Sequence, residues 1–222
     1  MDELTQSNTV TPERDTENGH SILYIQKLYR GYIIRKNNTT LKDGMTRELL
    51  ENCIDTYNNT IENEKKINQS LQKKKIRLSN FPSHISENIV KYVINKKYKI
   101  MPTWDTDKGD LCIHNEICKF TRIEVKGSID LSNGPPTFGP TEEWDFIYFV
   151  DGVNTHKKVY KVYEIRLSNQ SEKWKNIKVN KTQTYHDQCQ EKRRPRLTFK
   201  ELKSQLGNDC KLVFEGHLSQ LF

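Results

Sequence analysis

Residues 109–127, with the sequence GDLCIHNEICKFTRIEVKG, constrain the fold of this chain more than any other stretch. Two runs rich in apolar and β-branched side chains flank the turn-like sequence HNE, which predicts a β-hairpin. Side chains alternate between the two faces of a strand, so Glu124 and Lys126 share one face of the return strand. The hairpin also brings Asp110 near the end of that strand. We therefore expect carboxylates and an ammonium to converge on a mostly apolar hairpin.

Such a cluster of charges is costly in a purely structural hairpin, but it has a use in phosphodiester hydrolysis. Carboxylates hold a hard divalent cation through oxygen. The cation polarises the phosphate and lowers the pKa of a bound water. A lysine beside the carboxylates positions that water or stabilises the charge that develops at phosphorus. The hairpin thus indicates a phosphodiesterase site.

The rest of the second half predicts elements that pack around the hairpin. Residues 81–97 carry apolar side chains at helical spacing, with Glu87 in the first turn of the helix. The near-continuous apolar run EWDFIYFVD predicts a buried central strand. Further elements are an alternating strand over residues 158–167, a helix over residues 198–206 that opens on a capping box, and an edge strand over residues 210–214. Together they predict an α+β fold (α/β/α-like) with a mixed central sheet of about five strands flanked by helices.

The order of these elements resembles the PD-(D/E)XK nuclease superfamily. The motif residues are Glu87 on the helix, Asp110 before the first hairpin strand, and Glu124 and Lys126 in the sequence IEVK. The resemblance implies that Asp110 and Glu124 bind Mg²⁺, that Glu87 is an accessory ligand, and that Asp110, Glu124 and Lys126 form the catalytic set. Gly109 replaces the proline that precedes the aspartate in the superfamily motif. The resemblance covers about residues 82–167.

This resemblance implies a magnesium-dependent type II restriction endonuclease, which hydrolyses phosphodiester bonds at a short specific site in double-stranded DNA. Cutting both strands of a symmetric site requires two active sites, so a homodimer is expected. A Holliday-junction resolvase or a DNA-repair nuclease of the same superfamily is the alternative within this class. A long insert suited to reading bases argues against that alternative.

Charge and composition agree with a polyanionic partner. The formal net charge is +7 and the sequence pI is about 9.0, which favours nucleic acid. Residues 168–197 are polar and basic with few aliphatic side chains, and we expect this segment to contact DNA rather than to build core. The candidate DNA contacts are Lys173, Lys175, Lys178, Asn180, Lys181, Gln183, Arg193, Arg194 and Arg196.

The first 80 residues have a different character. Residues 1–20 predict a flexible tail, residues 21–80 a helical region that serves as a dimer or DNA arm, and residues 81–222 the nuclease core. Between Ile25 and Arg35 the spacing resembles an IQ motif, the helix that calmodulin-like proteins bind. A non-catalytic adaptor that binds such a protein is therefore the alternative from another functional class. An amphipathic helix that docks on its own protein explains the same spacing.

The five cysteines include no CxxC pair, which indicates reduced thiols in a cytoplasmic protein. No apolar run is long enough to span a bilayer, so we expect no membrane contact. Cys112, His114 and Cys118 offer soft ligands for zinc. The sequence supplies no fourth ligand at a suitable spacing, and both cysteines also fit buried strand positions.

Overall fold

The computed structural model describes residues 45–105, 109–114, 120–133 and 135–222. Within these residues, one six-stranded sheet has the strand order β1-β2-β3-β4-β5-β6. Strands β3 and β4 are parallel and the other neighbouring pairs are antiparallel, which confirms the expected mixed sheet and α+β class. The strands are β1 (Thr103–Trp104), β2 (Leu111–His114), β3 (Phe120–Ser128), β4 (Phe146–Asp151), β5 (Val159–Ile165) and β6 (Cys210–His217).

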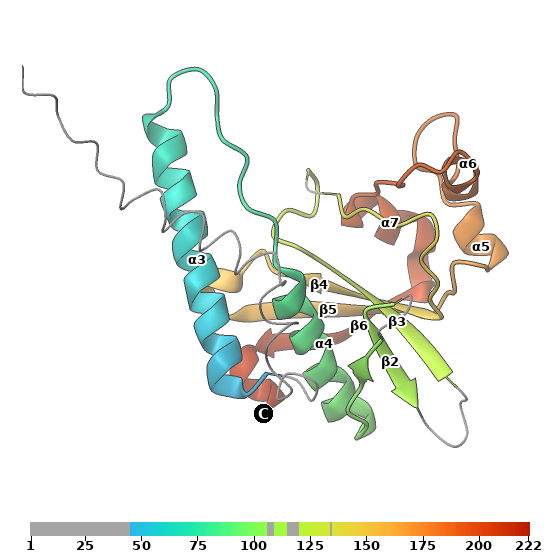
Figure 1. Cartoon of the computed structure of the whole chain (residues 1–222), viewed down its shortest axis with the longest axis horizontal. Coiled ribbons are helices and arrows are strands. Elements are labelled where there is room, and N and C mark those ends of the chain that lie inside the picture. Colours follow the sequence, from blue (N-terminus) through green and yellow to red (C-terminus); the bar gives the residue numbers. More distant parts are fainter. Residues whose placement is uncertain (1–44, 106–108, 115–119, 134) are drawn as a thin grey trace, which may run out of the picture. The chain divides into compact units, whose positions relative to one another are not determined.

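Helices flank the sheet, as expected. Among the described residues, two long helices precede the strands, and three short helices lie between β5 and β6 in the chain. In Figure 1 the three short helices gather together, apart from the two long ones. The helices are α3 (Arg47–Ser70), α4 (Ser83–Tyr98), α5 (Glu172–Lys175), α6 (Tyr185–Gln190) and α7 (Phe199–Leu206), with 3₁₀ turns η2 (Thr155–Lys157), η3 (Gly207–Asp209) and η4 (Leu218–Leu221).

Helix α4 and the preceding Phe81 pack on β3, and they come close to it at Gly127. A Cβ atom built on Gly127 would lie 2.6 Å from Cδ1 of Phe81 and 3.0 Å from Cβ of Ser86. These distances leave no room for a side chain. Because Gly127 faces α4, the alternation along β3 places Glu124 and Lys126 on the opposite face of the sheet.

We expect Gly127→Ala to lower the free energy of unfolding by about 1–3 kcal/mol, because the added methyl group must displace Phe81 or α4. Urea denaturation measures the change. Gly152→Ala is the matched control, since its Cβ would meet the same Phe81 ring at 3.3 Å, where a small shift relieves the contact. Equal losses for the two variants would show that α4 does not approach β3 as described.

The opposite face of the sheet carries a second apolar layer. In the parallel pair, Glu124 lies beside Ile147 and Lys126 beside Phe149. The Phe149 ring stacks on Phe199 of α7 with centroids 3.8 Å apart. Residues Trp174, Ile177, Tyr185 and Leu197 are buried in the same cluster. The expectation that residues 168–197 build no core is therefore wrong, because their few large apolar side chains all turn inward.

Glu164 of β5 is a buried carboxylate that joins α4 to the sheet. It accepts hydrogen bonds from the hydroxyls of Tyr148 (2.7 Å) and Tyr98 (2.9 Å), and it pairs with Lys97 at 3.1 Å and Arg166 at 3.3 Å. Burial alone raises the pKa of Glu164, but these partners outweigh it and hold the pKa below its ordinary value.

A lowered pKa means that the charged form of Glu164 stabilises the fold above the pKa of the unfolded chain. That contribution is lost as the pH falls through the folded-state pKa. We expect Glu164→Gln to lower the free energy of unfolding by about 1–3 kcal/mol at neutral pH. The difference from wild type should shrink in acid, as measured by urea denaturation across a pH series. If the difference in free energy of unfolding between wild type and Glu164→Gln grew in acid, the lowered pKa of Glu164 would be contradicted.

Several expectations lie outside the described residues. These are the tail over residues 1–20, the IQ-like run from Ile25 to Arg35, and the turn of the hairpin. The hairpin strands themselves pair as expected, with β2 antiparallel to β3. No helix among the described residues is long and apolar enough to cross a membrane.

Candidate active site

The hairpin brings Asp110 to the return strand. The amide of Asp110 donates a hydrogen bond of 3.2 Å to the carbonyl of Ile123. One oxygen of the Asp110 carboxylate accepts a hydrogen bond of 2.8 Å from the amide of Val125. Val125 lies between Glu124 and Lys126 in the chain, so this bond holds the Asp110 carboxylate beside the two charged residues of β3.

Glu124 and Lys126 contact each other on the face of β3 opposite α4. The Lys126 ammonium donates to Oε1 of Glu124 and lies 5.4 Å from the centre of the Phe138 ring. Glu124 is 3% exposed, and the Lys126 side chain is 16% exposed. Since little water reaches the pair, charges act on one another strongly here.

The pKa values of both groups show how crowded the site is with negative charge. Burial raises the pKa of Glu124; Lys126 opposes this shift, while Asp110 and Glu142 reinforce it. Burial lowers the pKa of Lys126, but the carboxylates of Glu124, Asp110 and Glu142 outweigh it and raise the pKa above its ordinary value. Lys126 therefore keeps its proton at neutral pH.

Glu142 belongs to this cluster, although sequence reasoning missed it. It lies in the connection between β3 and β4, and its Oε2 atom is 3.9 Å from Nζ of Lys126. The same oxygen accepts a hydrogen bond of 2.5 Å from the amide of Gly139. The sequence GPTE at residues 139–142 indicates a turn, but it does not show that the turn folds back over β3.

Asp105 supports the position of Asp110 and was also missed. Its Oδ2 atom accepts a hydrogen bond of 3.2 Å from the amide of Gly109 and lies 3.4 Å from Nε of Arg122. Its amide donates to the carbonyl of Asp110 at 3.2 Å. The Asp105 side chain, which is 1% exposed, thus ties Gly109 to Arg122 of β3.

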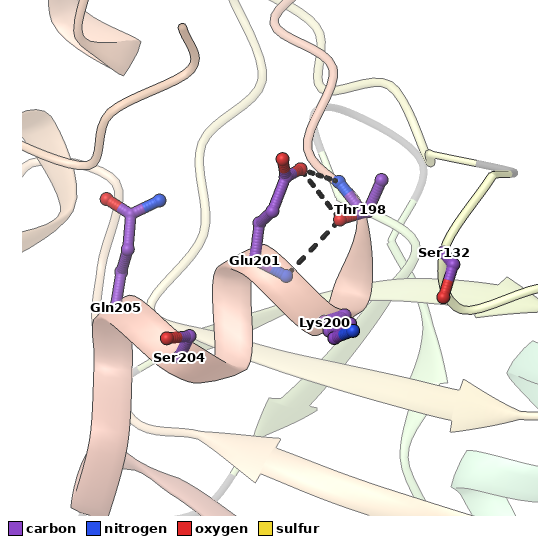
Figure 2. A pocket seen from close by; sticks show the side chains of 6 residues that line it. All are labelled: Ser132, Thr198, Lys200, Glu201, Ser204 and Gln205. Atoms are coloured by element: carbon purple, nitrogen blue, oxygen red, sulfur yellow. Dashed lines mark hydrogen bonds between the residues drawn. The ribbon is translucent and has the colours of Figure 1, made fainter. Parts of the chain in front are cut away.

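A surface hollow of about 470 Å³ lies elsewhere, at the start of α7. Figure 2 shows that its acidic residue, Glu201, turns back onto Thr198. The Glu201 carboxylate accepts from the hydroxyl of Thr198 at 2.7 Å and from its amide at 3.2 Å. This is the capping box expected from the sequence, in which the Glu201 carboxylate caps the N-terminus of its own helix. The residues that line the hollow do not include Asp110, Glu124, Lys126 or Glu142.

Of the three candidate zinc ligands, the structure describes Cys112 and His114. Sγ of Cys112 lies 3.4 Å from Nε2 of His114, whereas Cys118 lies outside the described residues. In the part of the chain that the structure describes, no group of three or more His, Cys, Asp or Glu side chains is arranged to hold a metal ion.

Comparison with known proteins gives the family. The model of the Bsp6I restriction endonuclease family matches residues 49–203 of the 222-residue chain. The chain belongs to the Bsp6I restriction endonuclease family. Searches of curated proteins and of solved structures found no match. Membership supports a type II restriction endonuclease, and hence an endodeoxyribonuclease that hydrolyses DNA. The matched region contains Asp110, Glu124, Lys126 and Glu142.

The segment over residues 168–197 is basic, with eight lysines and arginines against three acidic residues. Lys178, Lys181 and Arg196 are exposed. Other cations there are paired with acids: Lys173 with Asp209, Lys175 with Glu172, Arg193 with Glu191 and Arg194 with Glu142. Asn180 is exposed and holds a turn with Thr182 and Gln183. The nine candidate DNA contacts are thus placed around a buried aromatic core.

Glu87 lies in the second turn of α4 rather than the first, because the helix begins at Ser83 after Pro82. It is buried, at 2% exposure. Lys91 lies one turn further along the same side of the helix, with its ammonium 4.8 Å from the centre of the Trp104 ring in β1. This side of α4 therefore faces the end of the sheet where β1 pairs with β2.

The donor set fits a hard divalent cation. Asp110 and Glu124 supply carboxylate oxygens, and Mg²⁺ is commonly bound by one or two carboxylates together with water and substrate phosphate. Cation binding by this pair of carboxylates is part of the proposed function below.

Proposed function

We propose that this protein is a Mg²⁺-dependent type II restriction endonuclease of the PD-(D/E)XK superfamily that cuts a short specific site in double-stranded DNA. The observation that carries the proposal is the bond from the Val125 amide to Asp110, which holds that carboxylate beside Glu124 and Lys126. Family membership supports the same reaction class. Asp110 and Glu124 are the proposed metal ligands. Glu87 belongs to α4, which packs on the other face of β3, so it is not included in the proposed ligand set.

The proposed site residues have different roles in hydrolysis. Asp110 and Glu124 hold the cation, which when bound polarises the scissile phosphate and lowers the pKa of a neighbouring water. Lys126 keeps its proton, because its pKa is raised. Its ammonium therefore orients the attacking water by donating hydrogen bonds and stabilises negative charge on the phosphate oxygens. The Phe138 ring and the loop that carries it limit the access of bulk water to this ammonium.

DNA recognition is proposed for residues 168–197. The exposed Lys178, Lys181 and Arg196 suit phosphate contacts. Arginine, asparagine and glutamine side chains also match base edges in the major groove, so Arg193, Arg194, Asn180 and Gln183 are the candidates for sequence reading. Lys173 and Lys175 complete the proposed DNA surface.

The proposal includes a homodimer, since cutting both strands of a symmetric site requires two copies of the active site. It also includes an intracellular location, where the DNA substrate is found. Analytical sedimentation of the protein with and without DNA measures whether it is a homodimer.

Incubation with a sequenced plasmid and Mg²⁺ tests the function. We expect a fixed set of discrete fragments whose ends share one short sequence, and no cutting in EDTA. Cutting confined to cruciform or branched DNA would favour a resolvase instead. A complete absence of cutting across divalent metals would contradict the proposal.

A further inference from the structure

Glu142 lies between the proposed catalytic lysine and the proposed DNA-reading segment. Its Oε2 atom is 3.9 Å from Nζ of Lys126, and its Oε1 atom is 3.4 Å from Nη2 of Arg194. The Arg194 side chain is 62% exposed, whereas the Lys126 side chain is 16% exposed. One carboxylate thus bridges a cation at the surface and a cation in the active site.

The backbone reinforces this bridge. Thr137 pairs with Arg196 in an isolated antiparallel β-bridge, and the amide of Phe138 donates to the carbonyl of Pro195 at 3.1 Å. The loop that carries Glu142 is therefore fastened to the end of the segment that carries Arg194. A displacement of residues 194–196 on DNA would be transmitted directly to this loop.

The turn that aims the carboxylate is tightly built. The Glu142 side chain accepts from the amide of Gly139 at 2.5 Å, and the Glu142 carbonyl accepts from Nδ2 of Asn169 at 2.6 Å. A Cβ built on Gly139 would lie 2.5 Å from Cδ of Glu142, so the carboxylate occupies the space of a missing side chain. Its position over β3 is defined by these contacts.

We propose that Glu142 is a positioning residue that holds Lys126 in place and couples it to Arg194. In this arrangement, contact of Arg194 with DNA changes the hold of Glu142 on Lys126, so that the recognition segment sets the position of the catalytic ammonium. The inference rests on the proposed nuclease function and adds to it a link between DNA reading and catalysis.

A double-mutant cycle on the single-turnover rate of plasmid cleavage, at saturating protein, tests the coupling. We expect Glu142→Gln to lower the rate about tenfold or more, as for coupled neighbours, with unchanged affinity for DNA. Arg194→Gln should lower the rate in the wild type but hardly at all in the Glu142→Gln background. Arg193→Gln is the matched control, because Arg193 pairs with Glu191 instead. It should change the rate by the same factor in both backgrounds.

Gly139→Ala gives an independent perturbation, since it displaces the Glu142 carboxylate without removing its charge. We expect a loss of rate similar to that of Glu142→Gln, with a thermal midpoint close to wild type for both variants. A wild-type rate in either correctly folded variant, or independent effects of Glu142→Gln and Arg194→Gln, would overturn the coupling.

A second readout does not depend on cleavage. After reductive ¹³C-methylation of the lysines, the NMR signal of Lys126 is identified by its absence from Lys126→Met. We expect Arg194→Gln to shift this signal and Arg193→Gln to leave it in place. A wild-type protein that cuts no DNA would contradict the nuclease proposal alone. The absence of any shift in Arg194→Gln would contradict the coupling alone.

Discussion

Lys126→Ala is expected to abolish DNA cleavage while DNA binding is retained. The ammonium is held against Glu124 and near Glu142 inside the proposed site, where its positive charge would meet the reacting phosphate. Removing one such preorganised donor costs about 100- to 1,000-fold in rate in other hydrolases. Single-turnover cleavage with Mg²⁺ measures the rate, and gel-shift titration without divalent metal measures binding.

Two control variants separate catalysis from packing. Lys126→Met keeps an aliphatic side chain beside Phe138 and should fold like the wild type, yet it should be as inactive as the alanine variant. Lys161→Ala removes a strand lysine that pairs with Glu215 at 2.7 Å at the edge of the sheet, and it should cut normally. Cleavage by Lys126→Met at the wild-type rate would exclude the assigned role.

Asp110→Asn is expected to remove metal-dependent activity with little change in the fold. The asparagine side-chain oxygen still accepts the hydrogen bond from the Val125 amide, but the negative charge that attracts a hard cation is lost. We expect cleavage to fall about 1,000-fold, because bound metal contributes several kcal/mol of charge stabilisation. Calorimetric titration with Mg²⁺ or Mn²⁺ should show correspondingly weaker binding.

Glu215→Gln is the matched control, because it neutralises a carboxylate on β6 that pairs only at the surface with Lys161. It should bind metal and cut DNA as the wild type does. If Asp110→Asn binds Mn²⁺ as tightly as the wild type, Asp110 is not a metal ligand.

Local rules predicted much of the fold. The alternation of Ile123, Glu124, Val125 and Lys126 correctly separates the face toward α4 from the face that carries the charges, because strand geometry depends only on neighbouring residues. The capping box of Thr198 and Glu201 correctly marks the start of α7 for the same reason. Contacts of this kind are visible in a single sequence.

Other features depend on contacts between distant segments. Glu142 reaches Lys126 only because its loop folds back between β3 and residues 194–196. The burial of Trp174 and Tyr185 was missed because they are spaced irregularly among charged residues, with neither the helical nor the strand period. Asp105 lies five positions before Asp110, but its role depends on the side chain pointing inward, which the sequence does not show.

The location of a divalent cation tests the central claim most directly. Crystals of the protein soaked in Mn²⁺ and measured at a wavelength where manganese scatters anomalously would show where the ion binds. We expect a strong peak between the carboxylates of Asp110 and Glu124, within reach of the Lys126 side of β3. A peak only at another group of residues, with none beside Asp110 in a fully soaked crystal, would contradict the assignment of this hairpin as the active site.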